Sequence, residues 1–204
     1  MSRQALKKEE IPVVILCGGR GTRLKEETEV TPKPLVPIGE HPILWHIMKI
    51  YGAQGFRKFV LLVGYKGEQI KDYFYKYPVF HSDFTIHLGA RREQKIIYLD
   101  QPKEDWEVTI LDTGLHTQTG ARLRKAEAFL KAKTFMLTYG DGVANIDLDR
   151  LLKFHYESGK VATVTGVRPP ARFGAITVKS GVAFKFREKA QGPGSYINGG
   201  FFAV

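Results

Sequence analysis

The sequence predicts one α/β domain whose strands form a mostly parallel sheet. Two observations predict this fold: short continuous apolar runs, typical of strands buried on both faces, and segments between them with apolar residues at helical spacing. Strands that alternate with helices form βαβ units, in which successive strands are parallel. The composition agrees, because 204 residues with 43% hydrophobic and 25% charged side chains suit one globular domain with a substantial core.

The first half of the chain alternates between these two patterns. Its predicted elements are a strand at 12–16, a helix at 42–52, a strand at 58–65, a helix at 67–77 and strands at 84–89, 95–99 and 106–112. In the first helix, Leu44, Met48 and Tyr51 fall on the apolar face, and Gly52 suits a helix end.

The second half continues the alternation. Its predicted elements are a helix at 120–131, a strand and turn at 134–142, a helix at 147–159, a strand at 161–167 and a hairpin at 174–189. Asp147 is expected to cap the second of these helices, because its carboxylate can accept from a free amide of the first turn. The hairpin is expected to turn at Ser180 and Gly181.

Charge and composition narrow the classes of function. The net charge of +10 favours an acidic partner, but the basic residues are scattered along the chain, which argues against nucleic acid. No apolar run reaches the ~18 residues of a membrane helix, and the charged N-terminus lacks the apolar segment of a secretory signal. Cys17 is the single cysteine, so no internal disulfide can form, and we expect a cytoplasmic protein.

A glycine-rich loop follows the first strand, in the stretch LCGGRGTRL at 16–24. It matches neither the G-x-G-x-x-G fingerprint nor the P-loop pattern. Glycines permit positive φ and let several backbone amides approach one anion, and Arg23 adds a planar fork suited to phosphate oxygens. We interpret the loop as a phosphate site; the alternative is an ordinary turn with solvated basic residues.

Lys33 lies between Pro32 and Pro34. Prolines restrict the backbone around them, so this lysine is expected in a stiff, extended segment that aims its ammonium group. Farther along the chain, Asp141 follows a predicted strand in the stretch TYGDG. A carboxylate at the carboxyl end of such a strand can meet a metal–phosphate complex, although an Asp-Gly pair is also a common turn.

These stretches resemble a known family. LCGGRGTRL followed by TPKPLVPIG is similar to the signature of the sugar-phosphate nucleotidyltransferases, L-[AC]-G-G-x-G-T-R-L followed by P-K-P. The stretches PILWHIMKIYG, VGYKGEQIKDYF, VTILDTG, TGARLRK, TYGDGVANIDL, RFGAI and INGGFF resemble the glucose-1-phosphate cytidylyltransferase branch, in the same order from Val13 to Phe202. The resemblance implies a Rossmann-like three-layer α/β/α fold of the nucleotide-diphospho-sugar transferase type. It also implies one domain over 1–204, with 1–11 as a lead-in.

The resemblance further implies an activity and its partners. The expected reaction transfers CMP from CTP to a sugar 1-phosphate, α-D-glucose 1-phosphate, and yields CDP-glucose and pyrophosphate with Mg²⁺ as cofactor. UTP, dTTP or GTP as the nucleotide is the alternative, and so is a nucleotide-binding module with impaired catalysis. Family members are expected to be homo-oligomers and to continue beyond the equivalent of Val204, where a second metal-binding aspartate lies. We therefore expect the C-terminal part of the family domain to be absent here and turnover to be weak.

Site residues are implied by the same match. Arg23, Lys33 and Asp141 are expected to be catalytic, with Asp141 also the metal ligand. The residues expected to bind the nucleotide or the sugar phosphate are Leu16, Cys17, Gly18, Gly19, Arg20, Gly21, Thr22, Thr117, Arg122, Gly140, Glu188, Lys189 and Asn198. Without the resemblance, Arg122 would be interpreted as a solvated face residue and Cys17 as structural. Ala190 replaces the proline of the family's E-K-P motif, which removes a rigid neighbour of Lys189.

Overall fold

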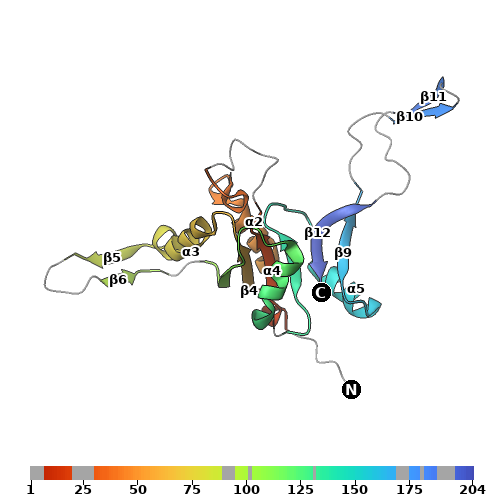
Figure 1. The fold of residues 1–204 in the computed structure, drawn as a ribbon. Helices are drawn as coiled ribbons and strands as arrows, with labels where there is room; N and C mark the ends of the chain where they lie inside the picture. Colours follow the sequence, from red (N-terminus) through yellow and green to blue (C-terminus); the bar gives the residue numbers. More distant parts are fainter. Residues whose placement is uncertain are drawn as a thin grey trace, which may run out of the picture.

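The structure is built around a six-stranded sheet in the order β7-β4-β1-β8-β12-β9 (Figure 1). It is a computed structural model that describes residues 7–19, 30–88, 95–100, 103–130, 132–168, 175–179, 182–187 and 196–204. The strands of the sheet are β1 (Val13–Cys17), β4 (Lys58–Val63), β7 (Glu107–Asp112), β8 (Met136–Tyr139), β9 (Thr163–Val167) and β12 (Ile197–Ala203).

The sheet is mostly parallel. Strands β7, β4, β1 and β8 run in one direction, and β12 is antiparallel to both of its neighbours, β8 and β9. In the centre, Ile15 of β1 is paired with Leu61 of β4 and with Thr138 of β8. The prediction of a mixed, mostly parallel sheet is confirmed. The parallel strands therefore present their carboxyl ends along one edge.

Helices cover both faces of the sheet. Val13, Ile15 and Cys17 of β1 pack in the larger core cluster, together with apolar side chains of three helices. These helices are α2 (Ile43–Ala53), α3 (Gly67–His81) and α5 (Leu148–Ser158). Val14 and Leu16 point to the other face, which is covered by α4 (Thr119–Lys125) and the short 3₁₀ helix η3 (Glu127–Phe129). This arrangement confirms the three-layer α/β/α fold.

Two predicted helices have different ends in the structure. Helix α3 continues past Pro78 to His81, and a ring nitrogen of His81 lies 2.8 Å from the carbonyl oxygen of Tyr77. The helix expected at 120–131 is α4 only as far as Lys125. There the amide of Ala126 donates to the carbonyl oxygens of Arg122 and Leu123, which tightens the chain into η3. The tighter turn places Ala126, which is fully buried, in the core of that face.

Helix α5 agrees with its prediction at both ends. The carboxylate of Asp147 accepts a hydrogen bond from the amide of Arg150 at 2.9 Å, as expected for an N-cap. At the other end Gly159 adopts φ +60°, the left-handed conformation that commonly ends a helix.

Three small antiparallel sheets lie outside the main sheet. They are β2 (Pro37–Ile38) with β3 (His41–Pro42), β5 (Phe84–His87) with β6 (Lys95–Tyr98), and β10 (Ala175–Lys179) with β11 (Val182–Arg187). The last of these confirms the predicted hairpin, whose turn at 180–181 lies outside the described residues. The β5–β6 hairpin projects away from the main sheet beyond α3 (Figure 1). Two further 3₁₀ helices, η1 (Lys8–Glu10) and η2 (Lys33–Leu35), complete the described elements.

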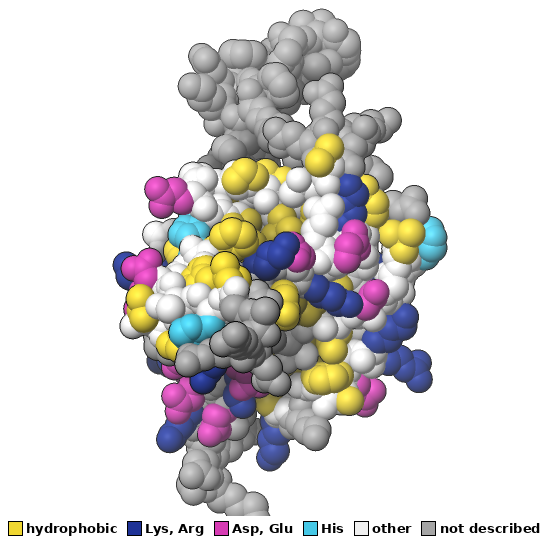
Figure 2. Space-filling view, turned by 90° about the vertical axis from the view of Figure 1, so that its left-hand side faces the viewer, with side chains coloured by type: hydrophobic (Ala, Val, Ile, Leu, Met, Phe, Trp, Pro, Cys, Tyr) yellow, Lys and Arg dark blue, Asp and Glu magenta, His cyan; other side chains and the backbone are white. Residues whose placement is uncertain are grey.

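The surface mixes both signs of charge. On the face shown in Figure 2, basic and acidic side chains are interspersed with apolar ones. Among the described residues, opposite charges form ion pairs, such as Lys8 with Asp149 and Lys76 with Asp72. Within the described part of the chain, no helix has both the length and the apolar character needed to span a membrane.

Burial in the core predicts that two leucines contribute differently to the free energy of unfolding. Leu61 is fully buried in the centre of the sheet, whereas Leu88 is 80% exposed. We expect Leu61→Ala to lower the free energy of unfolding by about 2–5 kcal/mol, because it removes buried apolar contacts and leaves a cavity. The matched change Leu88→Ala is expected to alter it by less than about 0.5 kcal/mol. Urea unfolding measures both, and equal effects would contradict this core.

Candidate active site

A pocket of about 300 Å³ opens at the edge where the parallel strands end. Ligands of open α/β sheets bind outside the carboxyl ends of the strands, so the position is the expected one. The lining residues come from the ends of β1 and β8, from η2 and from the start of α4. They are Leu16, Cys17, Gly18, Gly19, Lys33, Pro34, Thr117, Gln118, Thr119, Arg122, Tyr139, Gly140 and Asp141.

Lys33 and Asp141 face each other in this pocket. The ammonium nitrogen of Lys33 lies 3.6 Å from Oδ2 of Asp141, with side chains 20% and 50% exposed. The extended segment predicted around Lys33 is wrong, because Lys33 opens the 3₁₀ turn η2, in which the amide of Leu35 donates to the carbonyl oxygen of Pro32 at 2.8 Å. The turn is nevertheless stiff, since it contains one proline and follows another. The structure thus brings together two of the three predicted catalytic residues.

Gly140 lets the end of β8 approach β1 closely. Its amide donates to the carbonyl oxygen of Leu16 at 3.0 Å. A Cβ atom at this position would lie 3.0 Å from Sγ of Cys17 and from that same carbonyl oxygen, which is tighter than nine in ten real Cβ contacts. Glycine therefore allows Asp141, the next residue, to lie beside the loop that follows β1.

Gly18 is required for a reason that the sequence did not show. Neither Gly18 nor Gly19 has a positive φ, so the left-handed backbone expected of the loop glycines is not found at these two residues. A Cβ atom on Gly18 would overlap the guanidinium group of Arg122, whereas a Cβ on Gly19 would meet nothing within 4 Å. Gly18 makes room for an arginine that lies 104 residues away in the sequence.

Arg122 is buried rather than a solvated face residue, and it connects three strand ends. Its guanidinium donates at 3.0 Å to the carbonyl oxygen of Gly18 and at 3.0 Å to that of Val63, and it also donates to the hydroxyl of Thr113. Burial lowers the pKa of Arg122, and the charge of Asp112 partly opposes that change. Because arginine stays protonated in proteins, this network holds the ends of β1, β4 and β7 in place at any ordinary pH.

Thr117 is held by its own turn. Its hydroxyl donates to the carbonyl oxygen of Thr113 at 2.5 Å and lies 3.4 Å from the ammonium group of Lys125. Gln118 and Thr119 line the pocket beside it. Sequence reasoning missed these two, although Thr119 is the first residue of the stretch TGARLRK that carried the match and Gln118 directly precedes it.

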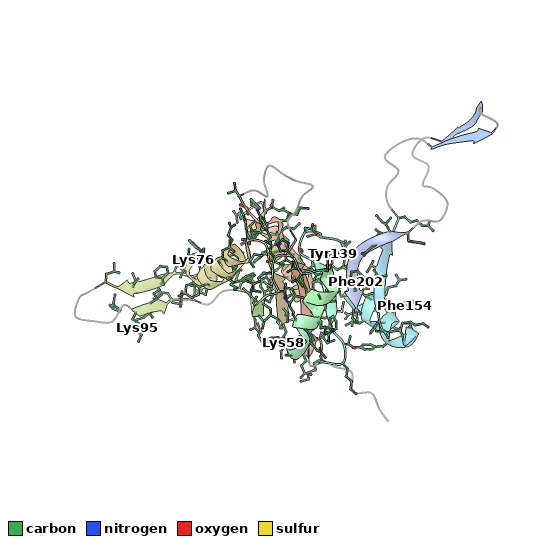
Figure 3. All side chains as sticks on the ribbon, viewed as in Figure 1. Lys58, Lys76, Lys95, Tyr139, Phe154 and Phe202 are labelled. Atoms are coloured by element: carbon green, nitrogen blue, oxygen red, sulfur yellow. The ribbon has the colours of Figure 1, made fainter. Side chains whose placement is uncertain are left out.

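Tyr139 is a further lining residue that sequence reasoning missed. Its position in the sequence could have indicated a site residue, because it is the last residue of β8, directly before Gly140 and Asp141. Asn198 is not a lining residue, but its amide group donates to the hydroxyl of Tyr139 at 3.1 Å. Figure 3 shows Tyr139 close to Phe202, which belongs to the neighbouring strand β12. Gly200, with φ +86° and a shift in the β12–β9 register nearby, marks a bulge in β12.

Cys17 lines the pocket but is almost fully buried. Burial raises the pKa of its thiol well above the usual range, and the negative charge of Asp141 raises it further. The thiolate is the reactive form of cysteine, so this side chain is expected to be inert.

Six predicted site residues lie outside the described residues. They are Arg20, Gly21, Thr22, Arg23, Glu188 and Lys189. The described residues show which groups could bind a metal. Among those that line the pocket, Asp141 is the one carboxylate. No group of three or more His, Cys, Asp or Glu side chains in the described ranges could hold a metal ion. Mg²⁺ commonly takes only one or two protein carboxylates, with phosphates and water as its other ligands, so Asp141 fits that ion.

The contact between Gly18 and Arg122 predicts unequal effects at adjacent glycines. Gly18→Ala is expected to lower the free energy of unfolding by about 1–3 kcal/mol, because the new methyl group displaces the buried guanidinium. Gly19→Ala is the matched control, with an expected change below about 0.5 kcal/mol. Thermal unfolding of both variants measures the difference. Equal stability of the two would show that Arg122 does not pack against Gly18.

The environment of Cys17 predicts that its thiol does not react in the folded protein. At pH 8 we expect no reaction with Ellman's reagent in buffer and one thiol per chain in guanidinium chloride, because only unfolding exposes the side chain and restores an ordinary pKa. The absorbance of the released thiolate measures the reaction. Stoichiometric modification of the folded protein would contradict the burial of Cys17.

Comparison with known proteins identifies the family. The family model described as nucleotidyl transferase matches residues 12–203. The chain is 47% identical over 192 residues to the glucose-1-phosphate cytidylyltransferase of Salmonella typhimurium, covering 94% of this chain and 74% of that protein. It is 49% identical over 191 residues to the probable glucose-1-phosphate cytidylyltransferase of Bacillus subtilis, covering 94% and 73%.

A solved structure supports the fold independently. HddC from Yersinia pseudotuberculosis, complexed with GMP-PN, matches with a TM-score of 0.63 over 95% of this chain and 76% of that one, at 23% identity. This structural match supports the fold alone, and the sequence matches identify the family. The chain belongs to the nucleotidyl transferase family of enzymes.

Proposed function

We propose that this chain transfers CMP from CTP to α-D-glucose 1-phosphate and releases CDP-glucose and pyrophosphate. The observation that carries the proposal is the pair Lys33 and Asp141, a cation and a carboxylate 3.6 Å apart in a pocket at the carboxyl edge of the sheet. The choice of CTP and glucose 1-phosphate is supported by the two relatives at 47% and 49% identity, which are both named for that reaction.

The chemistry needs positioning and charge stabilisation. A phosphate oxygen of the sugar phosphate attacks the α-phosphorus of CTP, and pyrophosphate leaves from the opposite side. That oxygen is already ionised at neutral pH, so the protein needs no base and no covalent intermediate. The barrier comes from bringing two anions together in line and from the charge on the phosphoryl oxygens.

Lys33 is suited to lowering that barrier. Its ammonium group is largely shielded from water, so its charge is screened less than that of an exposed lysine. Beside it, the backbone of Gly18 and Gly19 at the end of β1 is accessible from the pocket and can contact the triphosphate. Arg20, Gly21, Thr22 and Arg23 are proposed to extend this binding loop.

The remaining predicted residues keep proposed roles in binding the substrates. Thr117 and Asn198, together with Tyr139, which the sequence did not single out, are proposed to contact the nucleotide or the sugar, and Glu188 and Lys189 to hold the sugar phosphate. For Arg122 we propose a supporting role. Its hydrogen bonds to the carbonyl oxygens of Gly18 and Val63 hold the backbone from which the binding loop starts.

Asp141 is proposed to hold Mg²⁺. The carboxylate is half-exposed and directed at the same space as Lys33, and carboxylate oxygens are the protein ligands that this ion prefers. When bound, the ion would neutralise charge on the phosphates of CTP. Action in the cytoplasm and assembly into a homo-oligomer are further proposals, which cell fractionation and light scattering can test.

The proposal predicts pyrophosphate release that depends on Lys33. With CTP, glucose 1-phosphate and Mg²⁺ we expect release by the wild type, and a loss of about 10²–10³-fold in kcat for Lys33→Ala, as for the removal of one group that stabilises developing charge. Asp141→Asn and chelation with EDTA are expected to abolish most activity. Lys58→Ala is the control, since Lys58 lies at the other end of the sheet from Tyr139 (Figure 3) and pairs with Glu107 at the surface.

The outcomes separate the alternatives. Pyrophosphate release with UTP, dTTP or GTP instead of CTP would show that the enzyme uses another nucleotide in the same type of reaction. Binding of CTP by calorimetry without release from any nucleotide would indicate a binding module. An unchanged kcat in Lys33→Ala would contradict the role of this side chain.

A further inference from the structure

The position of Lys33 depends on how its segment is attached to the domain. Lysine has a long flexible side chain, so the ammonium group is placed well only if the backbone beneath it is fixed. Within η2, the amides of Leu35 and Val36 donate to Pro32 and Lys33. These bonds shape the turn but do not connect it to the rest of the protein. Three connections flank it: contacts at Val30 before the turn, the carbonyl oxygen of Val36, which accepts from the amide of Ile43 at 2.9 Å, and contacts at His41 farther along the chain.

Two side chains at the start of α3 hold the carbonyl oxygen of Val30. The ammonium group of Lys66 donates to it at 2.8 Å, and the side-chain amide of Gln69 donates to it at 3.1 Å. The neighbouring amide of Tyr65 lies 3.5 Å from the carbonyl oxygen of Gly18, which also lines the pocket. One short turn before α3 therefore touches both the glycine end of β1 and the segment that leads to Lys33.

Lys66 makes this contact from an unfavourable backbone conformation. It has φ +52° and ψ +33°, and no other non-glycine residue described by the structure has a positive φ. Left-handed backbone is uncommon for a residue with a Cβ atom and persists where the surrounding structure requires it. A glycine would adopt this conformation without strain, yet it could not reach Val30. The strained lysine is thus associated with a specific hydrogen bond.

The far end of α3 holds the other end of the segment. The ring of His41 stacks on Trp45 at 4.0 Å and on His81 at 5.6 Å, and His81 stacks on Tyr77 at 3.9 Å, all within 19° of parallel. The indole of Trp45 also donates to the hydroxyl of Tyr77 at 2.9 Å, which ties α2 to the last turns of α3. In Figure 1 the orange segment that contains Lys33 lies next to α3.

We propose that Lys66 is a positioning residue, which acts through Val30 to place the ammonium group of Lys33 beside Asp141. Helix α3 then serves as the frame for the catalytic lysine, with Lys66 and Gln69 at its start and the aromatic stack at its end. The proposal rests on the proposed function for its effect on turnover. The restraint of η2 by Lys66 does not depend on the proposed function and can be tested without it.

The test compares stability, local exchange and turnover in Lys66→Gly. We expect the melting temperature to stay within about 4 °C of the wild type, because relief of strained backbone offsets one exposed hydrogen bond. Hydrogen exchange at the amides of Leu35 and Val36 is expected to rise about fivefold, the factor given by the loss of one ordinary hydrogen bond. The kcat for pyrophosphate release is expected to fall about tenfold, because a misplaced catalytic group lowers the rate without unfolding the protein.

Three variants make the comparison specific. Lys66→Asn tolerates the left-handed backbone, lacks the ammonium group and should behave like Lys66→Gly. Lys66→Arg keeps a long cationic donor and should restore exchange and kcat to within about twofold of the wild type. Lys76→Ala removes another lysine of α3, one that pairs with Asp72 away from the pocket, and should leave both quantities unchanged.

The outcomes separate this proposal from the proposed function. Unchanged exchange at Leu35 and Val36 in Lys66→Gly overturns the positioning role, whether or not the wild type is active. Faster exchange with an unchanged kcat in an active enzyme also overturns it, because η2 would then move without affecting Lys33. A wild type that releases no pyrophosphate from any nucleotide overturns the proposed function alone, and the exchange comparison still decides the restraint by Lys66.

Discussion

The hydrogen bonds of one buried guanidinium organise the end of the sheet where the pocket lies. Arg122 binds carbonyl groups at the ends of β1 and β4 and the hydroxyl of Thr113 after β7. A buried charge without partners would be very unfavourable, so these acceptors must stay where they are for the charge to be tolerated. The same constraint excludes a side chain at Gly18 and also at Gly64, where a Cβ atom would lie 2.7 Å from the guanidinium. The geometry of the first strand end thus follows from an arginine on another element.

The two walls of the pocket are stabilised in different ways. On the Arg122 side, buried polar groups form hydrogen bonds with one another, which makes this side of the pocket, its floor, rigid. On the Lys33 side, the functional groups are partly exposed and lie on a short turn attached through α3 and through α2, whose first amide donates to the carbonyl oxygen of Val36. A rigid floor and a supported turn suit a reaction in which the protein mainly positions two anions.

Much of the fold follows from local patterns, and the differences have physical reasons. The strands and most helices were predictable because a buried strand or an apolar helix face needs its apolar residues at fixed spacing. Lys33, Gly140 and Asp141 were predictable because each lies next to a strand end or a proline in the sequence. Burial of Arg122 was not, since it depends on how β1, β4 and β7 are ordered in the sheet. The 3₁₀ turns at Lys33 and after Lys125 depend on local packing, which residue types alone do not determine.

The place of β12 has a consequence for how the chain matures during synthesis. This strand follows both of its neighbours in the sequence and lies between β8 and β9 in the sheet, so β9 has no partner in the described sheet until residues 197–203 have been synthesised. In a ribosome-bound chain that ends just before residue 197, β9 has no hydrogen-bonded neighbour and β8 is paired on one edge only. Such edges are sites of intermolecular association, so this seven-residue strand also protects the nascent protein from aggregation.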